Sequence, residues 1–460
     1  MNDWSWEGYD YGYISTSTLD LPQSTVSNGL LGPDGPAFKA LILTSQSNLT
    51  VDAIRTISQY AKSGLRIIIS GSPGVHMSAK TKTEERVKSG LANLVRQRNV
   101  YSCQEGEVVK TLNTLGIRPR VTHRANGTWY TTWREDREDM DAYLFALGDA
   151  NATAGTLKVS TSKIPYIYDA WTGQRRPVVR YSRDDESSTL TIPLTLAANQ
   201  AIIFGFSVTP LLGVDTPKHS IAKMSPAVLD AEYSRKTGLW LKVAASDETQ
   251  SVTLSDGTTR RIEKSTPCKP FALESWNLTV EHWEAPSNIS DSSTIAVKRN
   301  STHLLTSPLR SWLALSDTDL PTTSGVGFYQ TTFTWPPPSC AGAVKDYHDT
   351  GAIIALLPVL QTVRLSVNGK SVPPLNPTSP VADISVYLRK GENRIIAIVP
   401  STMWNYLRSI LPKLRNSGEV PLKFYQHGVG IVTLPAPGPV DNGLIGTMSI
   451  TPYRRYLVPG

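Results

Sequence analysis

Charged residues, cysteines and long apolar runs are all scarce in this sequence. Of its 460 residues, 18% are charged, which is below the usual quarter. The 46 basic and 39 acidic residues give a net charge of +7, but they form no basic run of the kind that nucleic-acid binders carry. No apolar stretch reaches the about 18 residues of a membrane-spanning helix. We therefore expect no nucleic-acid partner and no membrane span.

Several chemical signatures are absent as well. The sequence has no P-loop, no dinucleotide-binding glycine pattern, no HExxH motif and no CxxC pair. The GSPG turn at 71–74 lacks the lysine of a phosphate loop, and Ser72 is not in a nucleophile elbow. The run from Asp346 through Tyr347 and His348 to Asp349 has one imidazole and two carboxylates, a poor set of metal ligands. We expect no cofactor and no metal site.

Cysteines and sequons indicate the compartment. The chain has three cysteines: Cys268 and Cys340 lie in the same C-terminal region and are the expected disulfide, which leaves Cys103 as a free thiol. The chain also has six Asn-x-Ser/Thr sequons, at Asn48, Asn126, Asn151, Asn277, Asn288 and Asn300. Their number is either a coincidence or a sign of passage through the secretory pathway. We favour the secretory pathway, although the first residues do not resemble a leader.

The N-terminal part alternates strand and helix patterns, which predicts a parallel sheet covered on both faces. Thr50 is a typical N-cap, and an apolar stripe follows it at helical spacing. Strands are expected at 39–44, 65–70 and 100–103, and helices at 50–61, 80–98 and 105–115.

Beyond Asn126 the pattern becomes all-β, with short strands every 10 to 15 residues. Asn368-Gly369 predicts a two-residue hairpin turn. The expected units are an aromatic arm with the α/β domain at 1–125, a small β-sandwich at 126–210, a less regular bridging segment at 211–262, and a β jelly roll at 263–460.

Several motifs, taken in order, resemble the C-terminal half of fungal and bacterial α-L-rhamnosidase-like glycosidases. The resemblance implies a flavodoxin-like α/β domain, a small β-sandwich and a galactose-binding-like jelly roll. The motifs are GYDYGYI at 8–14, GPDGPAFKAL at 32–41, YDAWTG at 168–173, SGVGFY at 324–329, LSVNG at 365–369, GENR at 391–394 and GLIG at 443–446.

The sequence departs from that family in one important respect. In such enzymes the catalytic carboxylates lie in an upstream (β/α)₈ barrel of about 250 residues, whereas 38 residues precede the first expected strand here. Glycoside hydrolysis needs two positioned carboxylates. The chain is therefore expected to be either a fragment or an ancillary half retained for another purpose, such as binding carbohydrate.

As a stand-alone chain, the sequence also resembles fungal hetero-Diels–Alderases of tropolone–sesquiterpenoid biosynthesis. That resemblance implies a cofactor-independent cycloaddition between a tropolone o-quinone methide and humulene or a related olefin. Such a reaction needs an apolar cleft that orients small apolar and tropolone-like substrates, and a donor that polarises an oxygen.

Two groups of residues are candidates for this chemistry. Trp4, Trp6, Tyr9 and Tyr11 belong to an N-terminal cluster that also includes Asp10 and Tyr13; it either lines a cleft or pins the arm onto the α/β domain. Trp404 and Tyr406 begin an expected helical turn and provide a ring platform, unless Trp404 is core.

The remaining candidates are polar or lie beside a polar residue. His427, next to Phe424 and Tyr425, is a candidate donor, unless it is a loop histidine with local partners. Arg364 is a candidate for orienting an anionic tropolonate, unless it is simply an exposed strand arginine. An aromatic-lined apolar hollow would favour cycloaddition, whereas a shallow groove with acidic pairs and exposed rings would favour a sugar.

Overall fold

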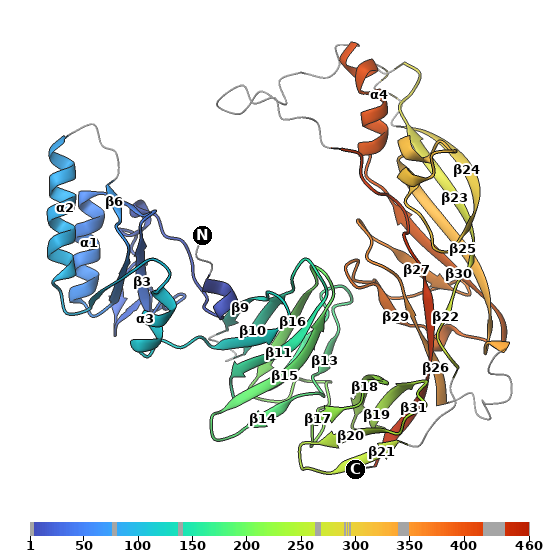
Figure 1. Ribbon diagram of the computed structural model, residues 1–460, viewed down its shortest axis with the longest axis horizontal. Coiled ribbons are helices and arrows are strands. Elements are labelled where there is room, and N and C mark those ends of the chain that lie inside the picture. The colour runs from blue at the N-terminus through green and yellow to red at the C-terminus, as the bar shows by residue number, and fades with distance from the viewer. Residues whose placement is uncertain are drawn as a thin grey trace.

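The computed structural model describes residues 4–75, 81–136, 141–262, 268–288, 291, 293, 296–338, 349–416 and 438–459. It is a mostly-β multidomain structure with one small parallel α/β sheet and several antiparallel sheets. The units follow one another around an open arc, from the α/β unit to the C-terminal sandwich (Figure 1). No helix in these ranges is long and apolar enough to cross a bilayer.

The α/β unit has a three-stranded parallel sheet with strands in chain order. Because each connection between parallel strands is right-handed, a sheet that grows in one direction places successive helices on the same face. α1 and α2 accordingly pack together on one face, and α3 covers the other (Figure 1). The elements are β3 (Ala40–Thr44), α1 (Val51–Lys62), β5 (Arg66–Ser70), α2 (Thr81–Val95), β7 (Val100–Cys103) and α3 (Val108–Thr114). Two short strand pairs flank them: β1 (Val26–Ser27) pairs with β2 (Leu30–Leu31), and β4 (Asn48–Leu49) pairs with β6 (Gly74–Val75).

The side chains of β5 contribute to the hydrophobic core on each face of the parallel sheet. Ile67 and Ile69 point into the core shared with α1 and α2, while Ile68 points toward α3. Thr50 caps α1 by accepting a hydrogen bond from the amide of Ala53, as predicted. The order β3-β5-β7 differs from the flavodoxin order, in which the first strand lies between the second and third. The described strands therefore have a parallel α/β arrangement without flavodoxin topology.

A small antiparallel sandwich follows. Trp129, Phe204 and Phe206 fill its core between the two sheets. One sheet has the order β13 (Arg175–Pro177), β12 (Ile164–Tyr168), β16 (Ala201–Ser207), β10 (Ala142–Leu147), β9 (Tyr130–Glu135), and the other β14 (Ser182–Asp184), β15 (Thr189–Leu196), β11 (Thr153–Ser160), β8 (Val121–Ala125).

The segment 211–262, which the sequence indicated as an irregular bridge, contains five strands. β18 and β19 join the C-terminal strand β31, so this segment belongs partly to the last sandwich; the sequence could not show this because the pairing strand lies some 200 residues away. The five strands are β17 (Ile221–Met224), β18 (Val228–Ser234), β19 (Gly238–Ala244), β20 (Gln250–Leu254) and β21 (Thr259–Ile262), and β31 spans Ser449–Val458.

The C-terminal sandwich packs two antiparallel sheets over the largest core of the described residues. The sheet that contains β31 continues through β26 (Thr350–Ala355) and β29 (Val381–Asp383), with β22 (Phe271–Ala272) also on β31. The facing sheet has the order β24 (Val297–Thr306), β23 (Ser275–Glu284), β25 (Gly325–Trp335), β30 (Gly391–Pro400), β27 (Arg364–Val367), β28 (Lys370–Ser371).

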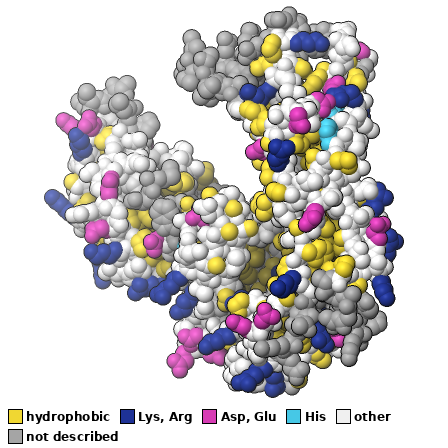
Figure 2. Space-filling model, turned by 45° about the vertical axis from the view of Figure 1, so that its right-hand side comes forward, with side chains coloured by type: hydrophobic (Ala, Val, Ile, Leu, Met, Phe, Trp, Pro, Cys, Tyr) yellow, Lys and Arg dark blue, Asp and Glu magenta, His cyan; other side chains and the backbone are white. Residues whose placement is uncertain are grey.

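Turns and short helices complete this sandwich. Asn368 and Gly369 both have positive φ and connect β27 to β28, so the predicted hairpin is confirmed. In the described part of this sandwich the short helices are η3 (Trp312–Ala314), η4 (Leu320–Thr322) and η7 (Ser385–Tyr387), and α4 spans Trp404–Asn416; η1 (Trp4–Glu7) and η2 (Thr16–Thr18) belong to the N-terminal arm. Figure 2 shows basic and acidic side chains interspersed over the visible face, in agreement with the scattered charges of the sequence.

Candidate functional site

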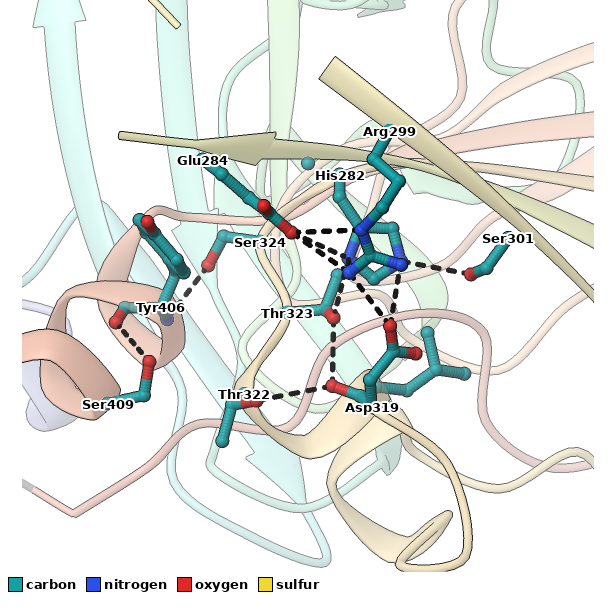
Figure 3. A network of polar contacts seen from close by, with 12 residues as sticks. His282, Glu284, Arg299, Ser301, Asp319, Thr322, Thr323, Ser324, Tyr406 and Ser409 are labelled. Atoms are coloured by element: carbon teal, nitrogen blue, oxygen red, sulfur yellow. Dashed lines mark hydrogen bonds and ion pairs between the residues drawn. The ribbon is translucent and has the colours of Figure 1, made fainter. Parts of the chain in front are cut away.

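The hairpin of β23 and β24 places a polar cluster at one end of the C-terminal sandwich. Trp276, Leu278 and Val280 alternate along β23 and point into the core, and the same alternation turns His282 inward. The antiparallel register puts Arg299 directly opposite His282. The segment around η4 lies against both residues (Figure 3). We call this group the His282 cluster; it consists of His282, Glu284, Arg299, Ser301, Asp319 and Thr323.

His282 is buried, with 2% of its surface exposed, and both ring nitrogens have partners. Its Nε2 lies 2.9 Å from Ser301 Oγ, and its Nδ1 lies 2.9 Å from Thr323 Oγ1 and 3.2 Å from a guanidinium nitrogen of Arg299. Burial is the main cause that lowers the pKa of His282; Asp319 opposes this effect and Arg299 adds to it. Burial thus favours the neutral form of the imidazole.

Arg299 joins two carboxylates at the rim of the cluster. One guanidinium nitrogen lies 2.9 Å from Glu284 Oε1 and 2.9 Å from Asp319 Oδ2. Burial would raise the pKa of Asp319, but the hydrogen bond from Arg299 and the nearby charges outweigh it, so the pKa is lowered. The side chain of Arg299 is 49% exposed and that of Asp319 42%. Water thus reaches a fixed array of ionised donors and acceptors.

The cluster is not arranged for hydrolysis. Ser301 Oγ contacts His282 Nε2, but it is also 2.9 Å from His303 Nε2. In a Ser-His-Asp triad the imidazole Nδ1 donates to a carboxylate, whereas Glu284 is 3.9 Å from the Nδ1 of His282. A glycosidase acid needs a raised pKa, and that of Asp319 is lowered. The geometry therefore suits binding rather than bond cleavage.

The first turn of α4 brings aromatic side chains to the same end of the sandwich. Tyr406 Oη accepts a hydrogen bond from the amide of Ala285, 2.8 Å away, and its own amide donates to Ser324 Oγ at 3.2 Å (Figure 3). Trp404 is half-buried, and its indole nitrogen donates to the carbonyl of Gly438 at 2.9 Å. Tyr406 is thus held beside Ala285, the residue that follows Glu284, and Trp404 is held against Gly438.

The N-terminal aromatics do not share one environment. Tyr9 is buried, and its hydroxyl donates to the carbonyl of Ile117 at 3.0 Å, which pins the arm onto the α3 face of the α/β unit. Trp4 and Tyr11 meet edge to face with 5.7 Å between ring centres. Tyr13 packs its ring against Tyr11 and is 85% exposed. Tyr9 is therefore structural, and Tyr11 and Tyr13 are accessible.

Asp10 and Trp6 are the remaining candidates of the N-terminal arm. The carboxylate of Asp10 accepts a hydrogen bond from the amide of Trp133 at 2.9 Å, and so connects the arm to the small sandwich. The backbone of Trp6 lies in η1, and its side chain lies outside the described residues.

Arg364, the predicted tropolonate ligand, lies on the wrong face for the His282 cluster. It begins β27 and pairs with Ile398 of β30, which pairs with Phe328 of β25. Phe328 is an exposed residue of the outer face, and Arg364 is exposed as well. The geometry matches the simpler alternative of an exposed strand arginine and does not bring Arg364 to Trp404.

Some predicted residues lie outside the described ranges. These are Phe424, Tyr425 and His427, the run Asp346, Tyr347 and His348, and Cys340. Asp349 is described and half-buried. Cys268 is disulfide-bonded, and Cys103 is a free thiol. No group of histidine, cysteine, aspartate or glutamate among the described residues is arranged to hold a metal ion.

The six sequon asparagines share one property, which is exposure. Each has its side chain at the surface of its unit, as attachment of a glycan requires. They are Asn48, Asn126, Asn151, Asn277, Asn288 and Asn300.

Two depressions in the described surface lie on the α/β unit. The first, of about 560 Å³ between α1 and α2, is lined by polar side chains that include Arg55, Glu85 and Arg86. The second, of about 580 Å³ beside α3, is lined by Lys110 and Arg118, among others. Neither has an aromatic wall, so neither resembles a site for apolar substrates.

A second charged group lies in the sheet that contains β31. Lys242 is only 8% exposed, and its ammonium contacts Asp383 at 2.8 Å, Asp230 at 3.5 Å and also Glu232. The Tyr453 hydroxyl donates to Asp383 at 2.6 Å. Burial would lower the pKa of Lys242, but the hydrogen bonds with Asp383 and Glu232 outweigh it, and the pKa is raised. We call these five residues the Lys242 cluster.

Sequence reasoning missed both clusters. A signal was present for the first: His282 and Glu284 are two residues apart in a strand pattern, and Arg299 follows in the next strand. Asp319 and Thr323 carried no such signal, because they reach the site from a loop beyond the hairpin.

Comparison with known proteins gives similarity of fold. No protein-family model matches the sequence, and no curated protein sequence does. A rhamnosidase from Novosphingobium sp. PP1Y superposes with a TM-score of 0.55 at 17% identity, over 96% of this chain and 36% of the rhamnosidase chain. This chain therefore spans about a third of the length of that enzyme and shares its fold over that part.

Two other glycosidases match more weakly. An exo-carrageenase from Bacteroides ovatus has a TM-score of 0.27 at 10% identity, over 45% of this chain and 26% of its own. A glycosyl hydrolase family 2 member from Bacteroides cellulosilyticus has a TM-score of 0.20 at 15% identity, over 40% of this chain and 21% of its own.

Proposed function

We propose that this chain binds carbohydrate and corresponds to the non-catalytic part of a rhamnosidase-type glycosidase, with a galactose-binding-like jelly roll as its last unit. The observation that carries the proposal is the rim of the His282 cluster. There, the half-exposed Arg299 holds Glu284 and Asp319, and Tyr406 of α4 contacts the amide of Ala285 next to Glu284. The fold shared with a rhamnosidase supports the same class of ligand.

The chemistry of the rim suits a sugar. Vicinal hydroxyls both donate and accept hydrogen bonds, and ionised carboxylates and a guanidinium supply the matching acceptors and donors in fixed directions. Arg299, Glu284 and Asp319 provide these groups at partial exposure, so a ligand reaches them without displacing the chain. Trp404 is half-buried, with the guanidinium carbon of Arg408 at 5.9 Å from its ring centre, and is the ring that we expect to contact the carbon-bound hydrogens of a sugar.

Two arginines of the same sandwich make a matched test. Titration calorimetry of unglycosylated protein with methyl α-L-rhamnopyranoside and methyl β-D-galactopyranoside is expected to show binding of at least one probe. Arg299→Ala is expected to weaken it about tenfold or more, because a charge-assisted hydrogen bond contributes about 1.5–3 kcal/mol. Arg364→Ala, on the opposite face of the sheet, is expected to leave binding unchanged. Equal affinity of Arg299→Ala and the parent protein would refute the site.

Hetero-Diels–Alder cycloaddition is kept as a second proposal because of one observation. The indole of Trp404 is fixed by Gly438 and so offers an oriented wall for a flat reactant. A hydroxymethyl-tropolone is mixed with humulene, with and without protein, and the adducts are resolved by chiral chromatography. If the proposal is right, the ratio of the adducts changes when protein is present, and Trp404→Ala makes this change smaller. Identical ratios in both mixtures would exclude it.

A further inference from the structure

Two sequons meet on one face of the C-terminal sandwich. Asn277 of β23 pairs with Leu304 of β24, and Asn300 of β24 pairs with Glu281 of β23. The two asparagines are therefore four residues apart along the hairpin, about 14 Å at the usual rise of a strand. Thr279, which completes the first sequon, faces Thr302, which completes the second, with 3.5 Å between their hydroxyls.

Strand alternation points this whole group outward. Leu278, Val280 and His282 of β23 face the core, so Asn277 lies on the opposite face of the sheet. On β24, Arg299 and Ser301 belong to the inward-facing His282 cluster, and Asn300 between them is exposed. The outer face is thus separate from the proposed carbohydrate site.

This face carries two features that favour self-association. Leu304 is 87% exposed and lies directly opposite Asn277. Among the described strands, β24 is also the outermost of its sheet, and all ten of its residues are exposed or half-exposed. Long exposed edge strands can pair with another chain, and proteins usually protect them with charge, proline or a cover.

We propose that Asn277 and Asn300 carry N-linked glycans that cover the outer face of the β23–β24 hairpin and block pairing along the β24 edge. In this modification the asparagine Nδ2 forms a bond to the anomeric carbon of an oligosaccharide. The bond from that carbon to the pyrophosphate of a lipid-linked donor breaks, the lipid pyrophosphate leaves, and the amide loses one proton. Each glycan is hydrophilic and large enough to exclude a second strand.

The two sequons lie close to the exposed Leu304 and to the β24 edge, respectively. A glycan on Asn277 begins beside Leu304 and shields its side chain. A glycan on Asn300 begins near the middle of β24, where a pairing strand would have to lie. The proposal requires passage through the secretory pathway and does not depend on carbohydrate binding by the inner cluster.

The first measurement is occupancy. The full chain is secreted from yeast, and glycopeptides that contain Asn277 and Asn300 are mapped by mass spectrometry before and after endoglycosidase treatment. Both sites are expected to be occupied, and Asn277→Gln and Asn300→Gln are each expected to remove one glycan. An unoccupied site in the parent protein would overturn the proposal.

The second measurement is the soluble monomer fraction by size-exclusion chromatography. Secreted protein with both substitutions is expected to form severalfold more aggregate than the parent, and adding Leu304→Lys is expected to reverse part of this. Asn151→Gln, at an exposed sequon of the other sandwich, is the control and is expected to behave like the parent.

Expression in a host without N-glycosylation separates the glycan from the asparagine. There the double variant and the parent are expected to aggregate equally, because neither carries a glycan. A difference between them in that host, or equal aggregation of the two secreted proteins, would overturn the shielding role.

Discussion

The Lys242 cluster and the His282 cluster are both charged groups in the C-terminal sandwich, but the buried member differs. In the first, the cation is buried and strands β18, β19, β29 and β31 supply every side chain. In the second, a neutral imidazole is buried and the ionised groups, Arg299, Glu284 and Asp319, remain partly exposed. A buried charge must keep its partners, whereas a hydrated rim can exchange water for a ligand. The comparison separates Lys242, whose charge is buried among its partners, from Arg299, whose partly exposed charge is the one on which the proposed carbohydrate site depends.

The largest expected effect is on folding stability when the buried cation is removed. Lys242→Met keeps the length of the side chain but leaves Asp230, Glu232 and Asp383 without their shared partner. We expect a loss of about 3 kcal/mol, at the low end for a broken buried pair because the carboxylates are partly hydrated. Urea unfolding measures it, with the exposed Lys223→Met as control. A loss below about 1 kcal/mol would remove the distinction between the clusters.

The next effect is a pH dependence specific to the His282 cluster. Because the pKa of His282 is lowered in the folded state, the unfolded chain takes up a proton below about pH 6.5 while the folded chain does not. Stability is therefore complete above that pH and falls as the pH decreases, by at most about 1.4 kcal/mol per pH unit for one proton.

His282→Gln is the variant that tests this. Its stability between pH 8 and pH 5 is expected to change less than that of the parent protein, because glutamine does not titrate. The titratable neighbours Asp319, Glu284 and His303 remain in both proteins, as does the charge of Arg299. Parallel slopes for His282→Gln and the parent protein would contradict the assignment.

The smallest expected effect is on stability when the rim cation is removed. Arg299 is half-exposed, and such ion pairs contribute about 0–1 kcal/mol. We expect Arg299→Ala to unfold within about 1 kcal/mol of the parent protein in urea. A loss as large as that of Lys242→Met would show that both clusters are structural and would weaken the proposal of a carbohydrate site.

Local patterns were enough to predict many elements of the fold. Thr50 as a helix cap, the hairpin at Asn368-Gly369 and the strand–helix alternation before residue 115 depend on neighbouring residues, and the structure has all three. The pairing of β19 with β31 was not predictable in this way, because Leu239 and Val458 meet only when the chain closes over more than 200 residues.

The candidate site shows the same limit. The aromatic residues Trp404 and Tyr406 were selected for their type, and the structure places them at the end of the sandwich. Arg364 was selected for its charge, and the register of β27 places it on the outer face. His282 was not selected: its spacing from Glu284 was a weak signal, and its partners Asp319 and Thr323 come from a loop that strand patterns do not connect to it.

By itself, the sequence determined the class of each region and the positions of its sequons, turns and strands, since these follow from side-chain period, capping and local backbone preference. Only the tertiary structure decided which charges meet. Arg299 reaches Asp319, and Lys242 reaches Asp383, through strand pairing and loop packing between distant segments. The strength of such contacts depends on burial, which single residues do not encode, because burial is a property of the assembled sheets.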